Sequence, residues 1–302
     1  MKKIVKMIYF LAIFFIVSTV ISAMFGYSGL KTGNQIEKIT IKGMITMEQS
    51  SQFLRPSISA ETIIKKLEEA EKSDNVKAII LDINSGGGSV VGSKIIAEKV
   101  QNLEKPVISL IGESALSGAY WIASASDYII SDDLSFVGSI GVIGSYLEFS
   151  NLIENYDITY QRLVSSEFKD IGSPFKSMTT EEKDLIQSRI DSVHDFMVES
   201  IAINRNVSIK DMQDLSDGIF YLGKDSIEIG LVDELGNEKT AFNKSLELAN
   251  IEDAQIRETK EKKSLLSYFV QYTSESWYFL GRGIGSELKI KPESFNTGIK
   301  LK

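Results

Sequence analysis

Apolar and polar positions along this chain follow two periods, one typical of β-strands and one typical of α-helices. The strand-like runs, rich in β-branched residues, lie at 36–45, 76–84, 106–112, 128–131, 137–144 and 158–164. The segments with apolar residues at helical spacing, or with helix-starting signals, lie at 59–72, 89–103, from about Ser117, and at 180–205, 209–215 and 238–249. Strands that alternate with helices of this length predict a parallel sheet with helical crossovers. The fold class is therefore α/β.

The N-terminus departs from this alternation. Three lysines within the first six residues precede an uncharged, mostly apolar run, Met7 to Phe25, which is long enough to cross a bilayer as a helix. The apolar part of a secretory signal is usually shorter, about 7–15 residues, so we expect a retained anchor. The alternative is cleavage, because Ile21 and Ala23, or Val20 and Ser22, could mimic a cleavage site. The lysines place the N-terminus in the cytoplasm and the rest of the chain outside the cell membrane, which the anchor crosses once.

These patterns divide the chain into four parts. Residues 1–25 hold the lysines and the transmembrane anchor, 26–35 a linker, 36–250 the α/β domain and 251–302 a C-terminal tail. The tail contains SLLSYFVQYTSESWYFLG, which polar residues interrupt too often for a second span. We expect part of the tail to be amphipathic, either docked or lying on a surface.

Composition narrows the classes of function. With 302 residues, 43% of them hydrophobic, the chain can bury a substantial core, and its net charge of −8 argues against nucleic acid as a partner. Cysteine is absent, which excludes disulfides, thiolate metal sites and a cysteine nucleophile. The single histidine, His194, leaves little room for metal chemistry and offers one candidate for a Ser/His pair. It lies within a predicted helix among acidic neighbours, where an ordinary solvated or packed histidine is the simpler interpretation.

The stretch LDINSGGGSVVG, residues 81–92, places three consecutive glycines between a strand and a helix. Val91 stands where a dinucleotide loop needs its third glycine, and no Gly-Lys-Ser/Thr follows, so neither nucleotide motif fits. A tight strand-to-helix turn is one explanation of the glycines. The other is the close approach of a reacting group, with backbone N–H groups that hold an oxyanion.

A second segment favours the oxyanion interpretation. In ESALSGAY, residues 113–120, a strand runs directly into Ser117, as it does around nucleophilic serines. The alternative is an ordinary helix N-cap. If Ser117 is a nucleophile, the N–H groups of Gly87 and Gly118 could form an oxyanion hole. Its base would be His194 or a desolvated, neutral lysine, and local physics alone does not select one lysine among the many in the chain.

Five segments follow one another between about residue 36 and residue 249. They are LDINSGGGSVVGS, ALSGAYWIASASD, FVGSIGVIG, SSEFKDIGSPFKSMTTEEKDLIQ and DGIFYLGKDSIEIGLVDELG. In this order they resemble the signal peptide peptidase A family, membrane-anchored serine proteases of the ClpP/crotonase-like superfamily.

The resemblance implies a ClpP/crotonase-like domain with a Ser/Lys dyad. Carried onto this chain, the nucleophile falls on Ser117, the general base on Lys169, and the hydroxyl that supports the lysine on Ser139. The two oxyanion donors fall on Gly87 and Gly118. No metal or other cofactor is implied. The implied substrates are remnant signal peptides or short unstructured peptides near the membrane, and the implied assembly is a homo-oligomeric ring whose active sites combine residues of neighbouring protomers.

Two departures from the family pattern affect these expectations. The usual Ser-Pro-Gly-Gly is Ser-Gly-Gly-Gly at 85–88, which loosens the turn but keeps its N–H groups. Leu116 stands where alanine is usual before the nucleophile, which affects substrate preference more than mechanism.

Three rival functions remain. The first is a stomatin-associated type of membrane serine protease, against which EFKDIGSP and the short tail argue. The second is a catalytically silent scaffold of the same fold, against which the presence of both Ser117 and Lys169 argues. The third is a crotonase-type acyl-CoA enzyme, which an external location would leave without substrate.

Overall fold

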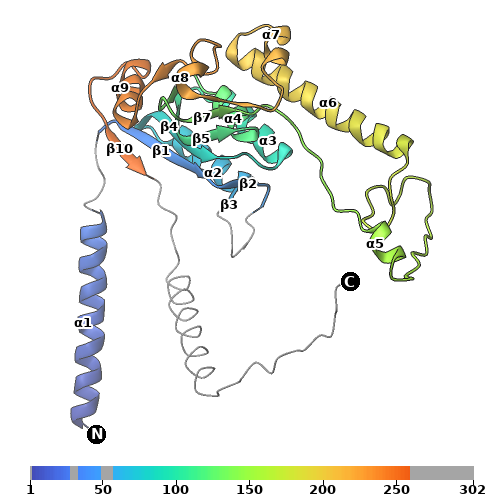
Figure 1. The fold of residues 1–302 in the computed structure, drawn as a ribbon. Helices are drawn as coiled ribbons and strands as arrows, with labels where there is room; N and C mark the ends of the chain where they lie inside the picture. Colours follow the sequence, from blue (N-terminus) through green and yellow to red (C-terminus); the bar gives the residue numbers. More distant parts are fainter. Residues whose placement is uncertain (1, 28–32, 49–56, 259–302) are drawn as a thin grey trace, which may run out of the picture. The chain divides into compact units, whose positions relative to one another are not determined.

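The computed structural model describes residues 2–27, 33–48 and 57–258. The first element is α1 (Lys2–Tyr27), a helix of 26 residues that includes the predicted apolar run (Figure 1). Among the described residues, we find no helix with the length and apolar character needed to cross a membrane. The transmembrane anchor therefore stays a prediction.

A sheet of eight strands forms the centre of the α/β domain in the described part of the chain. Along its main path the order is β10-β1-β4-β5-β6-β9, and all of these neighbours are parallel. In addition, β7 pairs with β5 in parallel and with β8 in antiparallel orientation, while β2 and β3 form a separate pair. The strands are β1 (Gln35–Lys42), β2 (Met44–Thr46), β3 (Ser57–Ser59), β4 (Val76–Ser85), β5 (Val107–Leu116), β6 (Tyr128–Ser131), β7 (Phe136–Gly138), β8 (Phe220–Leu222), β9 (Glu234–Leu235) and β10 (Gln255–Glu258).

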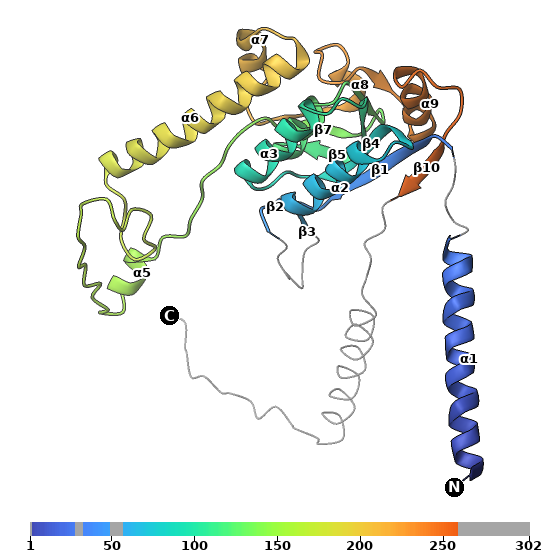
Figure 2. The ribbon, with the colours of Figure 1, turned by 180° about the vertical axis from the view of Figure 1, so that it is seen from behind.

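Helices connect these strands, and several of them cover the two faces of the sheet, whereas α5 (Ser150–Glu154) lies away from it (Figures 1 and 2). They are α2 (Ala60–Lys72), α3 (Val90–Gln101), α4 (Gly118–Ser124), α5 (Ser150–Glu154), α6 (Thr180–Arg205), α7 (Ile209–Asp214), α8 (Gly223–Ser226) and α9 (Glu238–Leu248). The parallel sheet and its helical crossovers confirm the predicted α/β class.

Burial on both faces explains why β4 reads as an almost continuous apolar run. Successive side chains of a strand point to opposite faces of its sheet. Ile79, Leu81 and Ile83 belong to the larger core, which α2, α3, α4 and α6 also build. Ala78 and Ile80 belong to a smaller core on the other face, where α9 contributes Ala241. A strand covered on both faces needs apolar residues at consecutive positions.

The structure corrects the prediction in three places. The run at 36–45, predicted as one strand, is divided at Gly43 into β1 and β2, which belong to different sheets. The run at 158–164, predicted as a strand, forms none, and all of its residues are exposed. No described strand lies beside it to pair with its backbone, and a strand requires such a neighbour. The run at 137–144 belongs to a strand only at its start, because β7 ends at Gly138.

The described residues cover only some of the predicted domain boundaries. Strand β10 joins the edge of the sheet beside β1, although it lies beyond the predicted boundary at residue 250. Linker residues 28–32 and the tail from residue 259 onward lie outside the described residues.

Candidate active site

Ser117 occupies the turn between β5 and α4 in a conformation that is rare for a residue with a side chain. Its φ is +52° and its ψ is −125°. Its N–H donates to the carbonyl oxygen of Gly138 at 2.7 Å, and its hydroxyl donates to the carbonyl oxygen of Gly141 at 3.3 Å. Because β5 and β7 pair up to Leu116 and Gly138, the sheet itself holds the strained turn in place.

The glycine loop lies directly beside this turn. A Cβ added to Gly87, whose φ is +92°, would stand 2.8 Å from the carbonyl oxygen of Leu116 and 2.9 Å from the nitrogen of Gly118. A Cβ on Gly88 would stand 2.2 Å from the carbonyl oxygen of Ile45. Both contacts are too short for any other residue. Gly87 therefore allows the loop to approach the turn at Ser117, and Gly88 allows it to approach Ile45.

The backbone donors near Ser117 differ in what they already bind. In this structure the Gly87 N–H donates to Ser85 Oγ at 3.1 Å, and that hydroxyl in turn donates to the carbonyl oxygen of Gly43 at 2.6 Å. Gly118 is the first residue of α4, where N–H groups have no partner within the helix. The nitrogen of Gly88 lies 3.7 Å from a Cβ placed on Gly118. The oxyanion roles of Gly118 and Gly87 both stay predictions, and that of Gly87 requires its N–H to leave Ser85.

Ser139 is brought to the same end of the sheet by β7. It directly follows Gly138, the residue whose carbonyl oxygen accepts from Ser117, and it too has a positive φ, of +46°. Its hydroxyl donates to the carbonyl oxygen of Gly218 at 2.8 Å. Because a hydroxyl has one donor and two acceptor lone pairs, Ser139 Oγ can still accept a hydrogen bond from an amine.

Lys169 is not brought to Ser117 within the chain. It lies in a turn between α5 and α6, its side chain is exposed, and no hydrogen bond or ion pair joins it to Ser117 among the described residues. The structure therefore brings Ser117, the glycine loop and Ser139 together, and leaves Lys169, the predicted base, elsewhere on the protomer.

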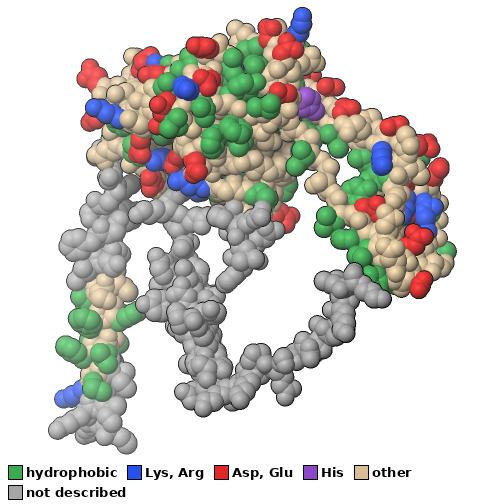
Figure 3. All heavy atoms as spheres, viewed as in Figure 1, with side chains coloured by type: hydrophobic (Ala, Val, Ile, Leu, Met, Phe, Trp, Pro, Cys, Tyr) green, Lys and Arg blue, Asp and Glu red, His purple; other side chains and the backbone are tan. Residues whose placement is uncertain are grey.

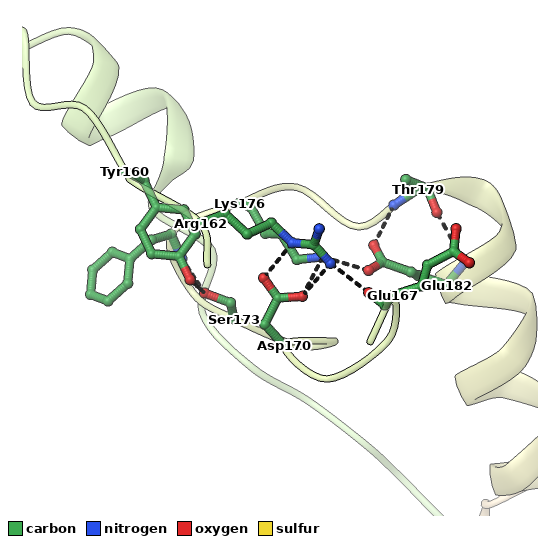
Figure 4. A network of polar contacts seen from close by, with 9 residues as sticks. Tyr160, Arg162, Glu167, Asp170, Ser173, Lys176, Thr179 and Glu182 are labelled. Atoms are coloured by element: carbon green, nitrogen blue, oxygen red, sulfur yellow. Dashed lines mark hydrogen bonds and ion pairs between the residues drawn. The ribbon is translucent and has the colours of Figure 1, made fainter. Parts of the chain in front are cut away.

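A network of charged residues surrounds the turn that carries Lys169 (Figure 4). Arg162 and Lys176 both pair with Asp170, at 2.8 Å and 3.2 Å. The hydrogen bonds from Arg162, together with the bond from Lys176, lower the pKa of Asp170 to about 2. Sequence reasoning missed these three residues, whose only signal was the mixture of charges on either side of Lys169.

His194 has a local partner and no contact with the nucleophile in the described structure. It lies on α6, where its Nε2 is 3.0 Å from the carbonyl oxygen of Ser216. This placement agrees with the simpler interpretation of an ordinary helix histidine, and nothing described supports a Ser/His pair.

Comparison with known proteins gives two family matches. The model of peptidase family S49 matches residues 99–252, and the model of the Clp protease matches residues 34–129. Together they include the glycine loop, Ser117, Ser139 and Lys169.

Three relatives illustrate the similarity. The chain is 34% identical over 316 residues to protein MJ0651 of Methanocaldococcus jannaschii, provisionally named a protease, across 100% of this chain and 99% of the relative. It is 31% identical to a protein of Enterococcus faecium provisionally named signal peptide peptidase SppA, across 85% of this chain and 72% of the relative. It is 34% identical to Protease 4 of Haemophilus influenzae, across 72% of this chain but only 35% of that longer protein.

Proposed function

Because this chain belongs to peptidase family S49 and is a serine-type protease, we propose that it is a membrane-anchored endopeptidase with Ser117 as nucleophile and Lys169 as general base. The observation that carries the proposal is the strained turn at Ser117, with the glycine loop packed against it. Backbone strain of this kind persists only where the surrounding structure holds it, and it clusters at active sites.

The proposed reaction proceeds through an acyl-enzyme. The neutral amine of Lys169 takes the proton of Ser117 Oγ as that oxygen bonds to the peptide carbonyl carbon. The carbonyl oxygen becomes an oxyanion and accepts hydrogen bonds from the N–H groups of Gly118 and Gly87. The C–N bond then breaks, and the leaving amine takes the proton from Lys169. Water then gives a proton to Lys169 as its oxygen bonds to the acyl carbon. The bond from that carbon to Ser117 Oγ breaks, and Lys169 returns the proton to Oγ, which restores both residues.

Labelling with a fluorophosphonate tests this proposal on the full chain in detergent. The probe phosphonylates activated serines, so we expect one adduct, on Ser117, with labelling that stops when a competing peptide substrate saturates the site. Peptide mapping by mass spectrometry locates the adduct. Adducts spread over several serines, or none while the protein cleaves peptides, would overturn the assignment of the nucleophile.

We further propose that Lys169 acts on Ser117 of a neighbouring protomer in a ring. Two observations support a second copy as the partner. Lys169 forms no hydrogen bond or ion pair with Ser117 in its own chain among the described residues, and the segment that precedes it, residues 143–164, exposes large apolar side chains (Figure 3). Ile143, Leu147 and Leu163 are 91%, 72% and 97% exposed. Exposed apolar side chains concentrated in one segment mark an interaction surface, and an interface also excludes water from the amine.

Mixed assemblies provide the test of a shared site. Protomers carrying Ser117→Ala and protomers carrying Lys169→Ala are each inactive, and we expect their co-assembly to restore about one quarter of the sites in a closed ring, since random neighbours then pair an intact serine with an intact lysine. Peptide hydrolysis by rings verified to contain both variants measures the recovery. No recovery in such rings would place both residues in one protomer, with the Ser/Lys chemistry unaffected.

The membrane anchor and the substrate class complete the proposal. The lysine-flanked apolar run supports the anchor, as do the exposed side chains of α1 between residues 9 and 19, which no other part of the described protein covers. An anchor of this orientation places the protease domain outside the cytoplasm, next to membrane-bound peptides. Remnant signal peptides and other short unstructured peptides are the proposed substrates, in keeping with the name of the Enterococcus faecium relative.

A further inference from the structure

The turn that carries Lys169 is built from successive backbone hydrogen bonds. Lys169 N–H donates to the carbonyl oxygen of Ser166 at 3.2 Å, Ile171 N–H to that of Phe168 at 3.2 Å, and Ser173 N–H to that of Asp170 at 3.0 Å. The side chain of Lys169 is exposed and forms no hydrogen bond or ion pair with any other described residue. The backbone of this turn is therefore held by its own hydrogen bonds, while the amine of Lys169 remains available to bind another group.

Arg162 holds this turn on both sides of Lys169 (Figure 4). Its guanidinium donates through Nε to Asp170 Oδ2 at 2.8 Å and through Nη2 to Asp170 Oδ1 at 3.0 Å. The same Nη2 also donates to the carbonyl oxygen of Glu167. One planar side chain thus links the residue just after the lysine with the residue two positions before it. The fork geometry of such a pair restricts orientation as well as distance.

Lys176 connects the same carboxylate to α6. Its Nζ lies 3.2 Å from Asp170 Oδ1 and also binds Glu182. Glu182 accepts from the N–H of Thr179 at 2.9 Å and thereby completes the capping box at the start of α6. The side chains of Asp170, Lys176 and Glu182 are only 14%, 19% and 6% exposed. The turn is consequently tied to the first turn of a 26-residue helix.

We propose that Asp170 is a positioning residue, which fixes the backbone around Lys169 through Arg162 and Lys176 and so presents the amine to the nucleophile. This inference rests on the proposed role of Lys169 as general base. A base must lie within hydrogen-bond reach of the proton that it takes, and a misplacement of about 1 Å can cost about 100-fold in rate. A long, flexible lysine side chain increases the need for a fixed backbone, because every added degree of freedom lowers the fraction of time in the reactive geometry.

The test compares Asp170→Asn with a matched control in the full chain. Asparagine keeps the size of the side chain but removes the charge that both cations bind. The control is Asp233→Asn, which removes a carboxylate outside the Lys169 turn. Arg205 donates to this carboxylate through Nη1 at 3.1 Å and through Nη2 at 2.6 Å, so the two aspartates are held in a similar way. Fluorophosphonate labelling separates two quantities for each variant: its end point counts folded sites, and its rate measures activation of Ser117.

For Asp170→Asn we expect an unchanged labelling end point, and a fall of roughly 10- to 100-fold in both the labelling rate and kcat per labelled site, with KM nearly unchanged. For Asp233→Asn we expect kcat per labelled site to equal that of the unchanged protein, whatever its stability. If Asp170→Asn lowers the end point by misfolding, Arg162→Lys gives the same test, since an ammonium cannot hold both carboxylate oxygens and the Glu167 carbonyl in one plane. Normal kcat per labelled site in the folded variants would overturn the proposal.

A third variant, Lys169→Met, distinguishes the positioning role of Asp170 from the proposed role of Lys169 as general base. If Lys169→Met keeps its activity, Lys169 is not the base and the proposed mechanism fails. If Lys169→Met is inactive while Asp170→Asn and Arg162→Lys behave normally, the base stands and only the positioning role is wrong.

Discussion

Replacing Ser117 by alanine is expected to lower peptide hydrolysis by roughly 10⁴-fold or more, the size of effect seen when a nucleophilic serine is removed. No other described side chain can replace its hydroxyl at the turn between β5 and α4. Alanine can keep the backbone conformation, because serine already holds it with a Cβ, and the bond lost to Gly141 is long, at 3.3 Å. Hydrolysis of a quenched fluorescent peptide measures the activity.

Thermal unfolding of the same variant supplies the control. We expect the Tm to remain within about 3 °C of the unchanged protein, since one weak hydrogen bond is lost and no cavity is opened. Full hydrolysis by a folded Ser117→Ala protein would show that Ser117 is not the nucleophile.

Replacing Lys169 by arginine is expected to lower hydrolysis by roughly 10²- to 10⁴-fold, the usual contribution of a general base. The guanidinium keeps the positive charge but does not lose a proton under any ordinary condition, so it cannot accept the proton of Ser117. Because the Lys169 side chain forms no described bond, the exchange removes no described contact of the folded protomer. Steady-state hydrolysis between pH 6 and pH 10 shows whether raising the pH restores any activity, and we expect none.

His194→Ala is the matched control for this experiment. The imidazole binds the carbonyl oxygen of Ser216 and does not contact Ser117, so hydrolysis is expected to change by less than about twofold. If His194→Ala were inactive while folded, and Lys169→Arg were active, the mechanism would be Ser/His instead of Ser/Lys.

Hydrophobic periodicity predicted most of the α/β domain, because each strand of a parallel sheet is a short apolar run and each crossover is a helix with its own period. It failed at 158–164, where the same kind of run is exposed and unpaired. A strand depends on a neighbour that supplies hydrogen bonds, and the local sequence does not reveal whether one is present. The apolar side chains of this segment have the composition of a strand, but in the single protomer they face solvent.

The sequence also predicted part of the candidate site. A serine directly after a strand and three glycines directly after another strand were visible as separate signals at 117 and 86–88. The choice of Lys169 was not accessible to local physics, because an exposed loop lysine looks like any other. It came from the order and spacing of five motifs. The mixture of charges around Lys169 did not reveal the pairing of Arg162 with Asp170, since that pairing depends on how the chain folds back between α5 and α6.

By itself, the sequence determined the α/β class, the apolar start preceded by lysines, and the two strand-to-helix turns at the three glycines and at Ser117. Only the tertiary structure decided that these turns meet, because β4 and β5 are parallel neighbours in a register that pairs Ser85 with Ala115 and so brings their carboxyl ends together. It also decided that Lys169 lies away from these two turns, on a turn that Arg162 and Lys176 hold through Asp170. The reason is physical: periodicity reports which face of an element is buried, whereas distances between elements follow from strand order and register, which no single element contains.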